Sequence, residues 1–83
     1  MYGLKGVIIP YKKLIKEGFD FSEYDYKANL LINTGKEIVM LENVLIINEM
    51  AICINAEGTN VFITKPSENK NVTIQRIDNI ELN

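Results

Sequence analysis

Short runs of β-branched residues, separated by turn signals, constrain the fold of this chain more than any other feature of its sequence. Most of its apolar residues are Ile, Val and Leu, and the branched side chains of Ile and Val suit a pleated, half-buried surface. The segment Asn33–Lys36 contains Gly35, which readily takes a positive φ, and Glu57-Gly58 is a strong hairpin signal. Small antiparallel barrels and curled sheets are the usual solution for such a chain.

The order of elements follows from this punctuation. Pro10 ends a first run, Val7–Ile9, and suits the first turn of a helix over Tyr11–Glu17, with Leu14 and Ile15 on its apolar side. Gly18 is a plausible C-cap, and the aromatic and acidic segment Phe19–Tyr26 is interpreted as an irregular connection. The later strands are predicted at Tyr26–Ile32, Glu37–Leu41, Val44–Asn48, Met50–Ala56, Thr59–Lys65, Val72–Ile77 and Ile80–Leu82.

The predicted fold class is therefore mainly β: a small antiparallel barrel or curled sheet of about five or six strands with one short N-terminal helix. The 83 residues form a single domain, 1–83. The closing strands Val72–Ile77 and Ile80–Leu82 are expected to seal it, with Asp78-Asn79 as a bend between them. Their expected core residues are Val72, Ile74, Ile77, Ile80 and Leu82.

The net charge and the cysteine content indicate which cellular compartment and which partners to expect. A formal net charge of -2 gives no general attraction to nucleic acid or anionic membrane. The single cysteine, Cys53, allows no internal disulfide, which fits a reducing compartment. The start of the chain does not resemble a signal peptide, and no apolar run is long enough to span a bilayer. We therefore expect a cytoplasmic protein without a membrane partner.

The residues that commonly carry catalysis are missing or placed badly for it. The chain has no histidine, the commonest general base. Cys53 lies within an apolar strand and is interpreted as a partly buried, inert thiol. Asp20, Glu23 and Asp25 lack the glycine and spacing of a calcium loop, so they are interpreted as a solvated acidic connection. The sequence predicts no catalytic residue, no metal site and no cofactor.

Tyrosines and lysines gather in the N-terminal third, and they are the candidate binding residues: Tyr2, Tyr11, Lys12, Lys13, Lys16, Tyr24 and Tyr26. Tyrosines with a charged rim serve as anchors in protein interfaces, and the same residue types stack on bases and hold phosphates. A competing interpretation is that Phe19, Phe21 and one or two of these tyrosines pack over the open end of the sheet.

The turn at Thr34-Gly35-Lys36 and the closing pattern of Val61-Phe62-Ile63 with Ile74-x-x-Ile77-x-x-Ile80 resemble those of Sm-like and SH3-like small β-barrels. The resemblance concerns architecture over Tyr26–Leu82. The paired Asp and Asn with which Sm-like proteins contact RNA have no clear counterpart in this chain, so the resemblance implies no RNA-binding residue.

These observations favour a non-enzymatic intracellular module that binds another protein and regulates or inhibits it. The frequent Asn, Lys and Ile residues are typical of a low-GC genome. Together with the small size, they suggest a phage or mobile-element inhibitor of a host defence system as a more specific hypothesis. Two alternatives stay open: a nucleic-acid-binding small β-barrel, and a small structural subunit of a homo-oligomer, such as a homodimer.

Overall fold

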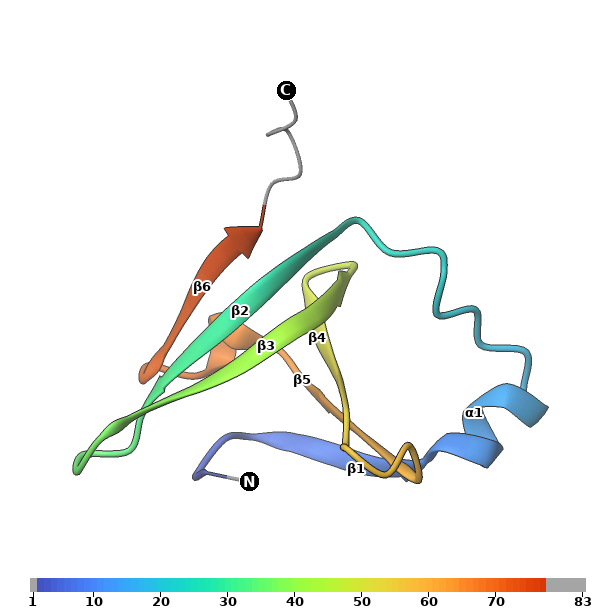
Figure 1. Cartoon of the computed structure of the whole chain (residues 1–83), viewed down its shortest axis with the longest axis horizontal. Helices are drawn as coiled ribbons and strands as arrows, with labels where there is room; N and C mark the ends of the chain where they lie inside the picture. The colour runs from blue at the N-terminus through green and yellow to red at the C-terminus, as the bar shows by residue number, and fades with distance from the viewer. Residues whose placement is uncertain (1, 78–83) are drawn as a thin grey trace.

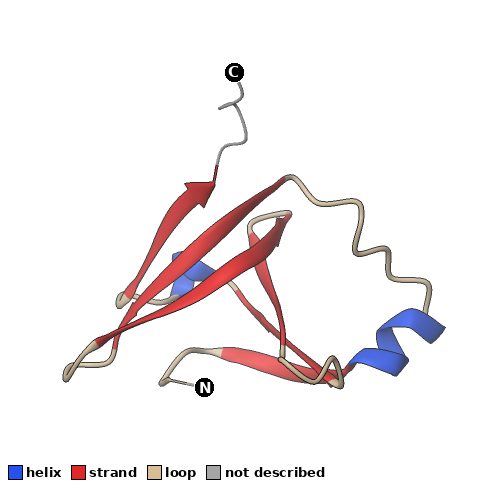
Figure 2. Ribbon diagram, in the orientation of Figure 1, coloured by secondary structure: helices blue, strands red, loops and turns tan. Residues whose placement is uncertain are grey.

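One antiparallel sheet that curls without closing dominates the computed structural model, which describes residues 2–77 (Figure 1). The sheet has six strands in the order β1-β5-β4-β3-β2-β6. The elements are β1 (Gly6–Pro10), α1 (Tyr11–Lys16), β2 (Tyr26–Asn33), β3 (Ile38–Ile47), β4 (Met50–Ile54), β5 (Asn60–Thr64), a 3₁₀ turn η1 (Pro66–Glu68) and β6 (Val72–Ile77). The prediction of a mainly β curled sheet with one short helix is confirmed, and Figure 2 shows how little of the described chain is helical.

β3 is one continuous strand, whereas the sequence predicts two strands, Glu37–Leu41 and Val44–Asn48, in its place. Register shifts between Ala28 and Leu30 of β2, so that Glu42 and Asn43 together lie opposite Asn29. Asn43 takes a left-handed φ of 56°, and its N–H donates to Asn29 Oδ1 at 3.2 Å. The polar pair thus forms a β-bulge, which bends a strand without ending it. The predicted break at Glu42-Asn43 was wrong for this reason.

The turn after β3 is a tight hairpin. Asn48 and Glu49 have φ values of 48° and 67°, and Ile47 pairs directly with Met50. Two successive left-handed residues are typical of a type I′ turn, whose twist matches that of the flanking strands. Asp25 supports this turn, because its Oδ2 accepts the Asn48 N–H at 2.9 Å.

Helix α1 is capped by Gly18 as predicted, but fewer of its side chains are buried against the sheet than expected. Gly18 has a φ of 85° and donates to the Ile15 carbonyl at 3.0 Å, while Phe19 donates to the Leu14 carbonyl at 2.9 Å. These two bonds form a Schellman motif. Leu14 is buried, but Ile15 is 49% exposed, so the expectation that both share the apolar side was wrong. Successive helical residues differ by about 100° in direction, and so short a helix buries only a narrow stripe.

The sheet is apolar on both faces. The inner face of the curl carries Ala28, Leu30, Val44, Ile46 and Ala51 in one buried cluster and Leu4, Ile32 and Phe62 in another. The outer face of β4 and β5 carries Ile52 and Val61, which pack with Leu14 of α1 and with the half-buried Phe19 and Phe21. Since neighbouring strand residues face opposite sides, this arrangement explains why Val61 and Phe62 are both buried.

The closing strand β6 pairs with β2 and has the predicted bounds, Val72–Ile77. Val72 and Ile77 are half-buried, but Ile74 is exposed, so its assignment to the core was wrong. Ile74 is exposed because β6 is an edge strand among the described residues. The predicted bend Asp78-Asn79 and strand Ile80–Leu82 lie outside the described residues.

Asn69 gives the loop Pro66–Asn71 a structural role. Its side chain is buried, accepts the Lys5 N–H through Oδ1 at 2.8 Å, and donates through Nδ2 to Thr64 Oγ1 at 3.1 Å and to the Lys65 carbonyl at 2.8 Å. The Thr64 hydroxyl donates in turn to the Lys5 carbonyl. This network joins the N-terminal segment to the end of β5.

Candidate functional site

The structure distributes the seven candidate binding residues over three places. Tyr11, Lys12, Lys13 and Lys16 lie on α1, at one end of β1, whereas Tyr2 lies beyond the other end of that strand (Figure 1). Tyr24 and Tyr26 lie at the start of β2, which the connecting segment separates from α1. They therefore do not form one continuous patch.

Tyr11 packs into an aromatic cover on the outer face of the sheet. Its ring stacks on Phe21 with centroids 5.0 Å apart and an interplanar angle of 12°, and Phe19 meets Phe21 edge-on at 4.7 Å. Offset stacking and edge-to-face contacts are the favoured geometries of aromatic pairs. Tyr11 therefore packs with Phe19 and Phe21, as the competing interpretation expects, but on the outer face of β4 and β5 rather than over the open end of the sheet.

The α1 lysines are exposed to solvent. Lys13 Nζ lies 3.4 Å from Glu17 Oε2, an i,i+4 ion pair on the helix surface. Such exposed pairs contribute little to stability. Lys12 and Lys16 form a small basic surface on α1. The ring of Tyr11 is not part of this surface, because it stacks on Phe21.

Tyr24 and Tyr26 each lie beside a cation that sequence reasoning did not select, and because Tyr26 and Lys27 are successive strand residues, the two pairs lie on opposite faces of the sheet. Lys27 Nζ lies 5.5 Å from the Tyr24 ring centroid, and the Arg76 guanidinium lies 4.3 Å from that of Tyr26. Arg76 reaches this place because β6 pairs with β2 and puts it opposite Ala28. Lys27 follows Tyr26 directly and could have been selected, whereas Arg76 depends on strand order.

The carboxylates of Asp20 and Asp25 in the connecting segment accept backbone N–H groups, from Ser22 and Asn48 respectively. Asp20 Oδ1 accepts the Ser22 N–H at 2.9 Å and its hydroxyl at 2.6 Å, and these bonds hold the pKa of Asp20 below its usual value. The Asp25 N–H donates to the Ile46 carbonyl at 2.8 Å. Within residues 2–77, no three His, Cys, Asp or Glu side chains come together as a group that could hold a metal ion.

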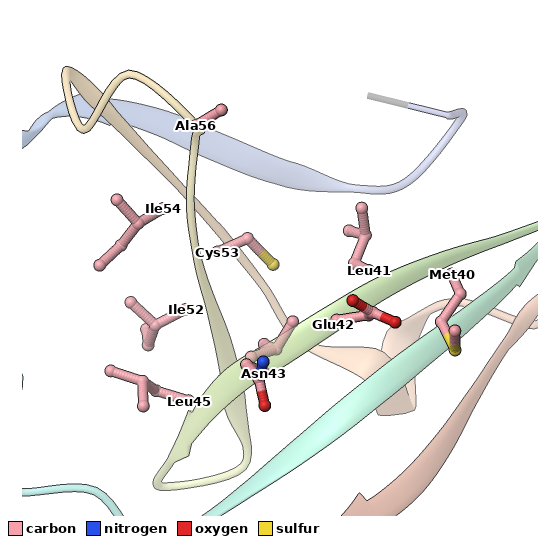
Figure 3. A pocket seen from close by; sticks show the side chains of 10 residues that line it. Met40, Leu41, Glu42, Asn43, Leu45, Ile52, Cys53, Ile54 and Ala56 are labelled. Carbon is pink, nitrogen blue, oxygen red and sulfur yellow. The ribbon is translucent and has the colours of Figure 1, made fainter.

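Two adjoining hollows open where β3 and β4 diverge. Their volumes are about 380 Å³ and about 350 Å³, and they share Leu41, Cys53, Ile54 and Ala56. The first continues along β3 to Met40, Glu42 and Asn43, and the second continues to Ile8 and Phe62. Figure 3 shows Cys53 and Ile54 on opposite sides of β4, with Leu41 across from Cys53. We call this surface the β3–β4 groove.

Strand pairing explains why the groove exists. β3 pairs with β4 only through Leu45, Ile46 and Ile47, so the earlier part of β3, Ile38–Val44, has no neighbour on that side among residues 2–77. The bulge at Glu42-Asn43 bends this part away. On the inner face, Ile8, Phe62 and Cys53 lie opposite one another across β1, β5 and β4 and form the floor of the second hollow.

Cys53 is partly buried, as predicted, and burial raises the pKa of its thiol to about 11. The thiolate is the reactive form, so we expect iodoacetamide at pH 8 to label Cys53 in the folded protein roughly 10- to 100-fold more slowly than in urea. The labelling rate should rise with pH up to about 11, because the thiolate fraction rises. Mass spectrometry of the alkylated protein measures both rates. Equal rates in folded and unfolded protein would contradict the burial of this thiol.

The groove was not selected from the sequence. Its lining residues have the alternating apolar pattern of ordinary strand residues, so nothing in that pattern marks them. The groove arises from the divergence of two strands, which depends on the bulge and on the length of the β4 pairing. Only Glu42-Asn43, read as a break, indicated that β3 changes direction at this point.

Comparisons with protein-family models, with curated proteins and with solved structures found no match to this chain. The antiparallel sheet is common to many small β folds and does not single out the Sm-like or SH3-like barrels. None of the helices formed by residues 2–77 has the length and apolar character needed to cross a bilayer.

Proposed function

We propose that this chain is a non-enzymatic module that binds an extended segment of a partner protein in the β3–β4 groove. The observation that carries the proposal is a groove with mostly apolar lining residues beside Ile38–Val44, a stretch of β3 that pairs with β2 on one side and has no neighbour on the other among residues 2–77. An exposed strand edge offers N–H and C=O groups to an added strand, and alternate side chains of that strand fill apolar pockets.

The lining of the groove defines the chemistry of the partner segment. Leu41, Cys53 and Ile54 supply apolar surface, so the segment needs apolar side chains at alternate positions. Glu42 is exposed on the rim and has no ion pair among the described residues. A lysine or arginine in the partner segment would complement this carboxylate.

Binding rather than catalysis is supported by the groups that line the groove. Among residues 2–77, Glu42 is the only carboxylate in the lining, and the thiol of Cys53 is protonated at neutral pH because burial raises its pKa to about 11. A small intracellular module of this kind would act by regulating or inhibiting its partner. A phage or mobile-element origin, with a host defence protein as partner, is the more specific hypothesis that composition adds.

Two matched variants test the proposal. The purified full chain is immobilised and exposed to a display library of random 12-residue peptides. Selected peptides should carry alternating apolar residues and a cation, and Ile54→Glu should weaken their binding at least tenfold by placing a charge in the groove. Ile15→Glu is the control, because Ile15 is 49% exposed against 43% for Ile54 but lies on α1, away from the groove and from the open edge of β3. Binding that survives Ile54→Glu, or the absence of selected peptides, would contradict the proposed site.

A second candidate function rests on Tyr24 and Lys27, an exposed tyrosine beside a cation at the start of β2. Exposed aromatics beside cations bind single-stranded nucleic acid, and Tyr24 is exposed. This alternative predicts salt-sensitive binding of a labelled single-stranded oligonucleotide that weakens in Lys27→Glu. The variant with Lys12, Lys13 and Lys16 all changed to Glu measures the contribution of α1. Undetectable binding at low salt would reject the alternative.

A further inference from the structure

β1 is an edge strand whose protection against pairing is limited to its short length and to Pro10 at one end. It pairs with β5 on one side and has no neighbour on the other among residues 2–77. Gly6–Pro10 contains no charged residue, and Val7 and Ile8, which face opposite sides of the sheet, are 55% and 62% exposed. Edge strands of monomeric proteins usually carry charges, bulges or a covering element. Val7 and Ile8 are therefore apolar surface on both faces of an open edge.

The hydrogen-bond register shows which backbone groups face outward. The Tyr11 N–H donates to the Thr59 carbonyl at 2.8 Å, and the same register continues through Pro10 opposite Asn60. Backbone groups alternate in direction along a strand, so those of Ile9 and Val7 also face β5. Those of Gly6, Ile8 and Pro10 therefore face away from β5. Pro10 has no N–H, and its place on the open side is where a sheet tolerates proline.

We propose that a second copy of this chain pairs with the open edge of β1, antiparallel, about a two-fold axis at Ile8. This register pairs all of Gly6–Pro10 with the same strand of the other copy. Ile8 of the two copies exchange N–H···O=C bonds, and Gly6 of each copy donates to the Pro10 carbonyl of the other. The contact shares Ile8 with the second hollow of the β3–β4 groove, but it rests on the open edge of β1 and not on the proposed function.

Side chains fit this register on both faces. Ile8 meets Ile8 of the second copy on the inner face, and Val7 meets Ile9 on the outer face; such apolar cross-strand pairs stabilise sheets. Gly6, which has no side chain, lies opposite the Pro10 ring. A Cβ at position 6 would lie 2.8 Å from the Phe62 ring and 2.5 Å from the Ile63 carbonyl oxygen, so packing within the chain also requires glycine there.

Charges do not oppose the contact. Continuing the register places Lys5 opposite Tyr11 of the second copy rather than opposite another cation. The paired edge is short, so the interface lies at the small end of specific interfaces, and a dissociation constant of about 10 µM to 1 mM is expected. The dimer should therefore form only in concentrated solution.

Analytical ultracentrifugation of the purified full chain at concentrations from about 10 µM to about 1 mM tests the proposed dimer, because weak association becomes measurable in that range. The wild-type protein should shift from monomer toward dimer. Ile8→Lys and Ile8→Glu should each remain monomeric, because the two-fold axis places like charges opposite each other. Mixing the two variants should restore dimer, since each charge then meets its opposite. Thr73→Lys, on the exposed edge strand β6, is the matched control and should dimerise as the wild type does.

Each other outcome overturns the proposal. A wild-type chain that stays monomeric at about 1 mM rejects a dimer of this strength. Loss of dimer in Thr73→Lys but not in Ile8→Lys assigns the contact to β6. Growth beyond dimer indicates head-to-tail pairing of β1 with β6, and failure of the mixed variants to associate rejects the two-fold register. Because no partner is present, none of these results bears on peptide binding at Ile54.

Discussion

Replacing Leu30 with alanine should lower the free energy of unfolding by about 3–5 kcal/mol, the largest effect that we expect from one substitution. Leu30 is fully buried at the centre of β2, where it packs in the inner cluster with Ala28 and Val44. Its removal loses apolar burial and leaves a cavity between strands that are paired on both sides. A domain of this size has a total stability of roughly 4–12 kcal/mol, so the variant should be close to unfolding. Urea denaturation followed by circular dichroism measures the loss.

The neighbouring Leu31 provides the control. It lies on the same strand but faces the other side of the sheet and is only half-buried, so Leu31→Ala should cost about 1 kcal/mol. Leu30→Met, which nearly conserves volume, should cost less than about 1.5 kcal/mol and keeps the comparison measurable if the alanine variant does not fold. Similar losses for Leu30→Ala and Leu31→Ala would contradict the assignment of the two faces.

The faces of β2 show what sequence reasoning could establish. The alternation of Tyr26, Ala28, Leu30 and Ile32 with Lys27, Asn29 and Leu31 indicates a half-buried strand, and in the structure Ala28, Leu30 and Ile32 are its buried residues. This worked because the side-chain period of a strand is fixed by backbone geometry. β4 was harder to read because Ala51 and Ile52 are both buried, one on each face of the sheet. A strand covered on both sides gives no alternation.

Features that depend on pairing between distant residues were not predictable. The bulge at Asn43 requires Asn29 opposite it, and Arg76 meets Tyr26 only because β6 lies beside β2. The same holds for the β3–β4 groove, whose shape follows from where pairing stops. Sequence pattern predicts local conformation and facing, but a site assembled from three strands depends on their order and register.

Replacing Asn69 with alanine should cost about 3 kcal/mol, although the residue lies in the most loop-like segment of the sequence. Its side chain is the shared partner of the Lys5 N–H, the Thr64 hydroxyl and the Lys65 carbonyl. Removing it takes three hydrogen bonds and leaves the partly buried Lys5 N–H without its partner, which costs more than the lost bond itself. The Thr64 hydroxyl still donates to the Lys5 carbonyl, and the Lys65 carbonyl still accepts the Glu68 N–H. Urea denaturation gives the stability, and hydrogen exchange of the Lys5 amide should show local loss of protection beyond the global effect.

Asn71 lies two residues away and is the matched control. Its Nδ2 donates to the Asn33 carbonyl at 3.0 Å in an exposed position, so water can replace the bond and Asn71→Ala should cost only about 0.5 kcal/mol. Asn69→Asp supplies a second test, because the direction in which its stability changes with pH can be predicted. It keeps an acceptor for Lys5 but places a carboxylate beside the Lys65 carbonyl, in a buried site where the charged form is disfavoured and the folded-state pKa is raised.

A raised folded-state pKa means that Asn69→Asp should be most stable at low pH, where the introduced carboxyl is protonated and can donate as the amide does. Its deficit relative to the wild type should therefore grow as pH rises from about 4 to about 7. The deficit of Asn69→Ala should not follow this dependence, since alanine does not titrate. If the two variants showed the same deficit at every pH, the side chain of residue 69 would be solvated. The N-terminal segment would then be held to β5 by other contacts.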